Sequence, residues 1–160
     1  MFMRVLGIDP GMAIVGYAIL NYENDRYFLE TSGSIQTDKD VSTSKRLLDI
    51  FNDLSLIVTK YKPDCAAVEK LYFFKNQKTI IPVAESRGVI LTALEKHGIE
   101  AYEYTPIEVK QVLTGYGRAS KKEVEQMVKY NLKIENLPKL DDTVDAIAIA
   151  ICHCRNLFVA

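Results

Sequence analysis

Four acidic residues stand at positions where acids could act together. Asp9 directly follows the apolar run VLGI, and Glu69 directly follows the apolar run CAAV. The ends of strands are where a sheet opens to solvent and where ligands usually collect. Asp142 and Asp145 are three residues apart, so at the start of a helix they lie on one face. If that helix packs on the sheet, as its alanines allow, all four carboxylates converge.

Converging carboxylates raise one another's pKa, so they need a cation to neutralise them. Oxygen ligands with no nearby Cys or His suit Mg²⁺, with Mn²⁺ as a substitute. Two such ions about 4 Å apart could activate a water and stabilise the leaving oxygen of a phosphodiester. Taken singly, each acid also fits a turn or a helix cap, and for Asp142 alone that is the simpler interpretation.

Basic and aromatic residues follow two of these acids. The segment KLYFFKN comes directly after Glu69 and suits stacking on unpaired bases, although Phe73 and Phe74 could equally pack inward. Residues 110–139 hold seven Lys or Arg against three Glu, in a chain whose formal net charge is −1. A local basic face of this kind can bind a polyanion such as nucleic acid. The alternative is that these basic residues only form the solvent-exposed face of a helix. We expect Lys110, Lys121 and Lys122 to hold phosphates.

The elements that must position these residues follow from the apolar pattern. It predicts three strands close enough to form an antiparallel meander, then alternating helices and strands, then further helices. The predicted strands are Val5–Asp9, Val15–Tyr22, Tyr27–Gln36, Cys65–Val68 and Ile99–Tyr104, and the predicted helices are Ser44–Tyr61, Val83–Leu94, Glu108–Leu113 and Lys122–Leu132. The stretch AIAIAI at 146–151 alternates like a strand, but Val144, Ile147 and Ile151 have helical spacing and Asp141-Asp142-Thr143 offers caps, which favours a helix. Together these elements predict an α/β domain.

Length and composition fit one globular domain. The chain has 160 residues, of which 48% are hydrophobic and 26% charged. No run approaches the ~18 apolar residues of a membrane span, and the N-terminus lacks a secretory pattern, which predicts a cytoplasmic protein. Cys152-His153-Cys154 could bind zinc, but with no second Cys or His pair it fits reduced, buried helix thiols better.

Five motifs, in order, resemble the RuvC family of bacterial Holliday-junction resolvases. They are GIDPG at 7–11 with Gly16-Tyr17, Val68-Glu69, ESRG at 85–88, Pro106 with Val109-Lys110, and DTVDA at 142–146. The resemblance runs from about residue 4 to residue 155. It implies a ribonuclease H-like fold, with a five-stranded mixed sheet in the order 3-2-1-4-5, strands 1 to 3 antiparallel and helices on both faces. Residues 1–160 would then form a single nuclease domain.

The resemblance also implies an activity and a role for each site residue. Asp9, Glu69, Asp142 and Asp145 would be catalytic and would hold Mg²⁺, as two ions per site. Lys110 and Lys121 would lie near the cut phosphate, with Lys121 also catalytic, and Tyr72 would stack on a base where many relatives carry Phe. Lys75, Arg118 and Lys122 are further DNA-binding candidates.

The implied enzyme is a homodimer that acts in recombination and repair. It would nick two opposed strands of a four-way DNA junction and leave 5′-phosphate and 3′-hydroxyl ends. A branch-migration motor of the RuvA and RuvB type would be its partner. The sequence adds one hint about dimerisation, because the apolar residues between Ile80 and Leu91 exceed what one core stripe needs.

Three alternatives stay open at the level of sequence. A strand, an Asp and a Gly-bearing turn also begin the phosphate-binding domain of actin-like and sugar-kinase ATPases, but this chain lacks a second such domain and a Gly-rich adenosine motif. A ribonuclease H that cuts RNA in a hybrid would keep the fold and change the substrate. A non-catalytic relative would bind nucleic acid or another protein only.

Overall fold

A five-stranded sheet forms the centre of the molecule. The computed structural model describes residues 1–71 and 77–157. The strands are β1 (Phe2–Asp9), β2 (Ile14–Glu23), β3 (Arg26–Gln36), β4 (Cys65–Glu69) and β5 (Glu100–Tyr104), in the order β3-β2-β1-β4-β5. β2 is antiparallel to β1 and β3, whereas β4 is parallel to β1 and β5. The predicted mixed sheet is therefore confirmed.

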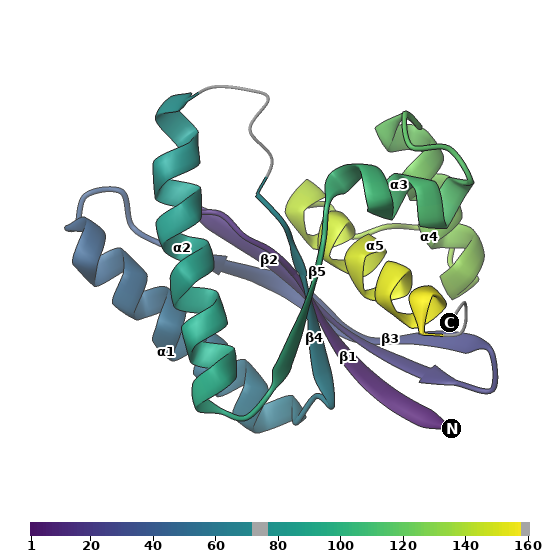
Figure 1. Ribbon diagram of the computed structural model, residues 1–160, viewed down its shortest axis with the longest axis horizontal. Coiled ribbons are helices and arrows are strands. Elements are labelled where there is room, and N and C mark those ends of the chain that lie inside the picture. Colours follow the sequence, from purple (N-terminus) through teal and green to yellow (C-terminus); the bar gives the residue numbers. More distant parts are fainter. Residues whose placement is uncertain (72–76, 158–160) are drawn as a thin grey trace.

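Helices cover both faces of this sheet (Figure 1). They are α1 (Thr43–Tyr61), α2 (Gln77–Lys96), α3 (Pro106–Thr114), α4 (Lys121–Leu132) and α5 (Asp141–Asn156). Because side chains alternate along a strand, Leu6 and Ile8 pack on the side of α1 and α2, while Val5 packs on the side of α3, α4 and α5. No helix in the described part of the chain is long and apolar enough to cross a membrane.

Two details of the helices differ from the sequence prediction. Helix α2 begins at Gln77, six residues before the predicted Val83, and contains Pro82. Proline removes a backbone hydrogen bond and breaks the helical pattern, which concealed the first turns. Helix α5 exists as predicted, but its N-cap is Leu140 and no side chain caps it. The idea that Asp141-Asp142-Thr143 supplies the caps is wrong; both aspartates lie in the first turn, where the helix dipole favours negative charge.

Helix α5 lies unusually close to the sheet because two strand glycines face it. A Cβ atom added to Gly7 would overlap the backbone carbonyl of Ala146, and one added to Gly16 would overlap that of Asp142. The Thr143 hydroxyl also donates to the Gly33 carbonyl of β3 at 3.1 Å. Backbone atoms of the helix and the sheet are therefore in direct contact at the first turns of α5.

Candidate active site

Two of the predicted acids end adjacent parallel strands. Asp9 is the last residue of β1 and Glu69 the last of β4, and the register that pairs Ile8 with Val68 makes them neighbours. Strand alternation places both on the α5 side, together with Gly7 and Ala67. Asp9 is only 8% exposed, and its side chain is hydrogen-bonded to that of Glu69. The two carboxyl groups therefore form a buried pair at the open edge of the sheet.

The other two acids come to this pair from α5. Gly16 lies opposite Asp9 in the β1–β2 register, and the Asp142 backbone rests on Gly16, so Asp142 is held beside Asp9. One helical turn later, Asp145 lines the same cavity as Glu69. Both helix acids are close enough to act on the Asp9 charge. The predicted convergence of all four is thus present in the structure.

Burial and mutual repulsion change the proton affinity of this cluster. Burial, followed by the charge of Glu69, raises the pKa of Asp9 far above its usual range. Burial and the Glu69 charge raise the pKa of Asp145 to about 6. Burial also raises the pKa of Glu69, while the hydrogen bond to Asp9 and the charge of Lys110 oppose that rise. The cluster therefore resists full ionisation unless positive charge is supplied.

The donor set fits a hard divalent cation. All four groups are carboxylates, and burial together with the neighbouring acids raises the pKa of Asp9 and of Asp145, as expected where negative charge is incompletely neutralised. Within residues 1–71 and 77–157, no three His, Cys, Asp or Glu side chains are already arranged as ligands of one ion. Asp9 and Glu69 instead lie within hydrogen-bonding reach of each other.

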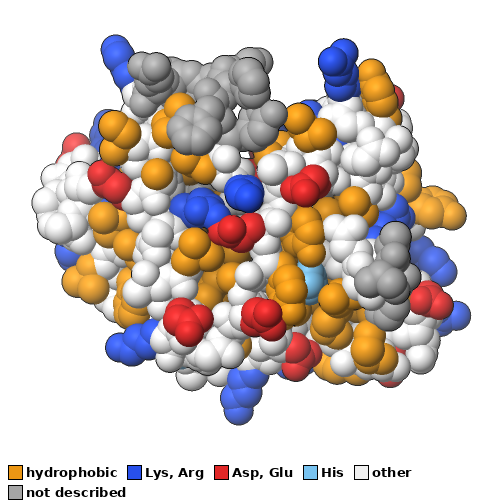
Figure 2. Space-filling view, viewed as in Figure 1, with side chains coloured by type: hydrophobic (Ala, Val, Ile, Leu, Met, Phe, Trp, Pro, Cys, Tyr) orange, Lys and Arg blue, Asp and Glu red, His pale blue; other side chains and the backbone are white. Residues whose placement is uncertain are grey.

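Two lysines flank the acids in a cavity of about 250 Å³. Lys110 of α3 and Lys121 of α4 line it together with Glu69 and Asp145. The Lys121 amine also pairs with Asp141 at 2.6 Å. Cations of α3 and α4 thus stand beside the acids. On the face of the molecule that Figure 2 draws, basic and acidic side chains lie side by side near the centre.

Supporting residues hold the turn after Asp9 in place. The buried Ser86 hydroxyl of α2 donates to the Gly11 carbonyl at 2.6 Å, which fixes the Pro10-Gly11 turn beside the site. Sequence reasoning assigned no role to Ser86 and did not identify Gly7 as a packing position. Two features of the sequence could have indicated these roles. Ser86 places a hydroxyl on the inner face of a helix, and Gly7 is a glycine within a strand, which often marks a close approach of another backbone.

Some expected site residues lie apart from the acids. Arg118 and Lys122 are exposed and line neither of the cavities that adjoin Glu69, so of the two neighbouring lysines it is Lys121 that reaches the site. Tyr72 and Lys75 lie outside the described residues. The absence of a zinc site at Cys152 and Cys154 stays a prediction, but both thiols are free and buried as expected.

A mixed sheet in this order, with acids at the ends of β1 and β4 and on α5, defines a ribonuclease H-like nuclease fold. A family model described as crossover junction endodeoxyribonuclease RuvC matches residues 5–153. The chain belongs to this RuvC family. It is 46% identical to the RuvC of Caldanaerobacter subterraneus, over 96% of this chain and 93% of the relative. It is 50% identical to that of Petrotoga mobilis, over 94% of this chain and 93% of the relative.

Solved structures agree with this assignment. The RuvC structure from Thermus thermophilus aligns with a TM-score of 0.92 at 29% identity, covering 98% of this chain and 96% of that one. The same protein in complex with a Holliday junction substrate aligns with a TM-score of 0.92 at 28% identity, over the same shares. The yeast mitochondrial resolvase Ydc2 shares the fold, with a TM-score of 0.70 at 19% identity over 96% of this chain and 79% of that one.

Proposed function

We propose that this chain is a structure-selective endonuclease that resolves four-way DNA junctions by nicking two opposed strands, in recombination and repair. The observation that carries the proposal is the cluster of Asp9, Glu69, Asp142 and Asp145 beside Lys110 and Lys121. The family, and a relative solved with a Holliday junction, support the choice of substrate. Residues 1–160 act in this proposal as one nuclease domain in the cytoplasm.

The four carboxylates would hold Mg²⁺, or Mn²⁺ in its place, as two ions per site. A metal held by these residues would supply a Lewis acid for the hydrolysis of the phosphodiester by water, with 5′-phosphate and 3′-hydroxyl ends as the products. The acids of β1 and β4 are rigidly held, because both follow buried strands. The acids of α5 are fixed by backbone contact at Gly16. The backbone that carries the four carboxylates is thus preorganised, and their side chains would turn toward the metal when it binds.

The lysines act on the substrate. Lys110 and Lys121 line the cavity that contains Glu69 and Asp145, so a phosphate in that cavity meets two ammonium groups. In this proposal Lys121 offsets charge that develops at the cut phosphate. Arg118 and Lys122, which are exposed, would hold more distant phosphates. Base stacking by Tyr72 and phosphate binding by Lys75 stay predictions.

Symmetric cutting requires two active sites, so we propose a homodimer. Ile81 of α2 is 65% exposed, while Ile90 of the same helix is fully buried in the core. Only part of the apolar excess between Ile80 and Leu91 is therefore available for an interface. Ile81→Glu should give a monomer by light scattering, and an unchanged mass would count against this face. A branch-migration motor of the RuvA and RuvB type is the expected partner.

A cleavage gel with three labelled substrates tests the proposed function. A four-way junction, a linear duplex of the same sequence and an RNA–DNA hybrid are each incubated with Mg²⁺, with Ca²⁺ or with a chelator. Paired nicks in the junction alone, with Mg²⁺ and not with the chelator, are the expected result. Asp9→Asn should bind the junction without cutting it.

Other outcomes identify the alternatives. Preferential cutting of the hybrid would indicate a ribonuclease H, and tight junction binding without cutting would indicate a non-catalytic relative. Undiminished nicking by pure Asp9→Asn protein would show that the acid cluster is not the active site.

A further inference from the structure

A second cavity adjoins Glu69 on the other side of the acids. It has a volume of about 220 Å³ and lies between the end of β4 and the first turns of α2. Its wall is mainly apolar, formed by Pro10, Leu71, Ile80, Val83 and Pro106. Its charged side chains are Glu69, Lys70 and Arg87. A small apolar space with two cations at its edge is therefore continuous with the site.

Arg87 is held in a fixed orientation within this cavity. Its side chain is 19% exposed and forms an ion pair with Glu103 of β5. Its Nε is buried and has no hydrogen-bond partner among the described residues. The guanidinium has five N–H donors, so it can bind a further anion while it keeps the ion pair with Glu103. The structure thus orients a cation beside the site without satisfying it.

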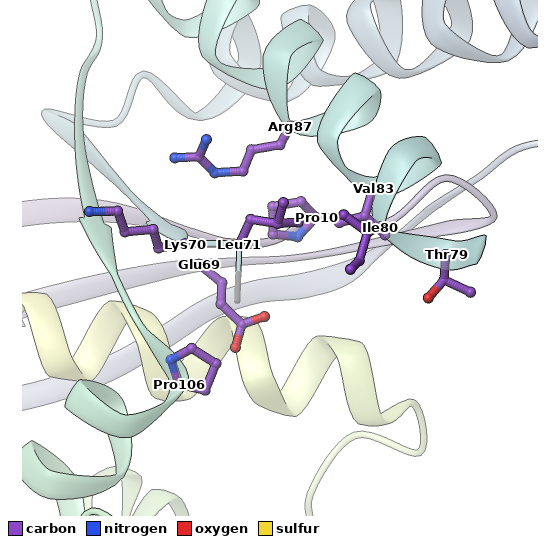
Figure 3. Close-up of a pocket in the computed structure, with 9 residues that line it drawn as sticks. All are labelled: Pro10, Glu69, Lys70, Leu71, Thr79, Ile80, Val83, Arg87 and Pro106. Carbon is purple, nitrogen blue, oxygen red and sulfur yellow. The ribbon is translucent and has the colours of Figure 1, made fainter. Parts of the chain in front are cut away.

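Lys70 is the second cation. Its backbone N–H donates to the Tyr104 carbonyl at 2.8 Å, which extends the β4–β5 pairing past Glu69 and fixes where its side chain begins. Figure 3 shows Lys70 and Arg87 extended to the same side of the cavity, while the Glu69 carboxylate is directed the other way, toward Pro106 and α5. The Glu69 carboxylate therefore faces the acid cluster, while Lys70 and Arg87 face the second cavity.

The two cavities that adjoin Glu69 have matching charge. Both include Glu69 and Pro106 in their walls, and each carries two cations: Lys110 and Lys121 on one side, and Lys70 and Arg87 on the other. A nucleic-acid strand that crosses the acids would place successive phosphates in both. The cavity bounded by Lys70 and Arg87 also offers the apolar wall, which suits the face of an unpaired base.

We propose that the cavity bounded by Lys70 and Arg87 binds the nucleotide next to the cut phosphodiester. Its phosphate lies on Lys70 and Arg87, and its unpaired base lies on the apolar wall formed by Ile80 and Val83. The cavity is too small for a stacked base pair, so it favours a strand opened at a branch point. This inference rests on the proposed function and adds to it a subsite that selects unpaired DNA.

The test measures binding rather than cutting. Synthetic four-way junctions carry one neutral methylphosphonate at each phosphate near the branch point in turn, and affinity is measured by fluorescence anisotropy in chelator. Lys70→Gln is compared with Lys60→Gln, an exposed lysine in the last turn of α1. The plot of log affinity against log salt should become shallower by about one for Lys70→Gln and should not change for Lys60→Gln.

Combining each protein variant with each methylphosphonate position shows which phosphate Lys70 contacts. One methylphosphonate next to the cut should weaken binding to the wild-type chain and have no further effect on Lys70→Gln, while remaining additive with Lys60→Gln. An abasic nucleotide at that position should weaken wild-type binding several-fold. Arg87→Lys provides a second variant that keeps the charge opposite Glu103.

Two results would overturn the inference. One is that the effects of Lys70→Gln and of the methylphosphonates add at every position, and the other is that the chain does not bind junctions at all. Cutting is scored separately with Mg²⁺. A chain that binds with the expected coupling but does not cut would therefore contradict the proposed function and leave the subsite standing.

Discussion

The two ends of helix α5 bring polar side chains into buried positions in opposite ways. At its last turn, His153 is 1% exposed, and its ring lies 2.7 Å from the Tyr104 hydroxyl and 3.3 Å from the Cys65 sulfur. With the hydroxyl donating to Nδ1, the Nε2–H donates to the sulfur, so the neutral ring is fully satisfied. Burial lowers the pKa of His153 and raises that of Cys65 to about 11, so both stay uncharged.

At the first turn, the acids repel one another. Asp9 and Glu69 share one hydrogen bond, and Asp142 and Asp145 raise the pKa of Asp9 further. Groups that satisfy each other contribute to the stability of the fold, whereas groups that remain in conflict are available to a ligand of opposite charge. The same helix therefore carries a structural network at one end and the proposed metal site at the other.

The largest expected effect comes from removing one acid. Asp9→Asn should lower the rate of junction cutting by at least about a thousandfold, because a ligand of the activating cation is lost. It should also raise the free energy of unfolding in chelator by about 1 to 3 kcal/mol, because a buried repulsion is relieved. Mg²⁺ should stabilise the wild-type chain in thermal melts and leave Asp9→Asn unchanged. If Asp9→Asn protein were less stable than wild type and still cut junctions, the acids would be structural groups, and the contrast with His153 would be wrong.

Removing the histidine should do the opposite. His153→Ala leaves a cavity and two unpartnered groups, which should cost about 3 kcal/mol of stability. The cutting rate at 25 °C should stay within about twofold of wild type. Tyr104→Phe, which removes one hydroxyl, should cost about 1 kcal/mol. Denaturant unfolding measures stability, and a large loss of cutting by folded His153→Ala protein would show that the two ends are coupled.

The pH dependence of stability should have opposite signs at the two ends. The folded pKa of Asp145 is raised from 3.8 to about 6, so its contribution is present below about pH 4 and is lost as pH rises through 6. After allowance for its partial exposure, the loss is about 2 kcal/mol. The pKa of His153 is lowered from 6.5, so stability is lost as pH falls below 6.5.

Denaturant unfolding in chelator between pH 4 and 8 measures both slopes. Asp145→Asn should remove the loss of stability that accompanies rising pH. His153→Gln should remove the loss of stability that accompanies falling pH. If neither variant changes the pH profile, burial does not perturb these groups as the structure indicates.

The smallest effect is expected at the edge of the site. Lys121 and Asp141 form an exposed ion pair, which contributes at most about 1 kcal/mol. Asp141→Asn should tighten junction binding by about two- to fivefold, because Lys121 then no longer has to break its ion pair with Asp141 in order to bind a DNA phosphate. In a Lys121→Gln background the same change should have less effect. Equal effects in both backgrounds would show that Asp141 acts through general charge only.

Residue order and local chemistry predicted most of this architecture. The short apolar runs before Asp9 and Glu69 predicted that both acids stand at the ends of strands, and the structure confirms those positions. The stretch 146–151 was correctly predicted as a helix, although the caps proposed for it were wrong. The start of α2 was missed because Pro82 interrupts its pattern.

Contacts between distant segments could not be predicted in the same way. The hydrogen bond from Ser86 to Gly11 and the ion pair between Arg87 and Glu103 join residues from different elements. The local pattern around Ser86 can indicate the face of the helix on which it lies, but not that its partner is the Gly11 carbonyl. The satisfied His153 network was likewise invisible, since Cys65 and Tyr104 meet it only after the sheet has formed.

The seating of α5 on Gly7 and Gly16 affects how this protein tolerates change. The spacing between the strand acids and the helix acids is set there by the radii of backbone atoms. Side chains elsewhere in the core can be exchanged and repacked over generations without altering that spacing. The two glycines thus set the distance between helix and sheet, so other core residues can be substituted while the separation of the acids stays the same.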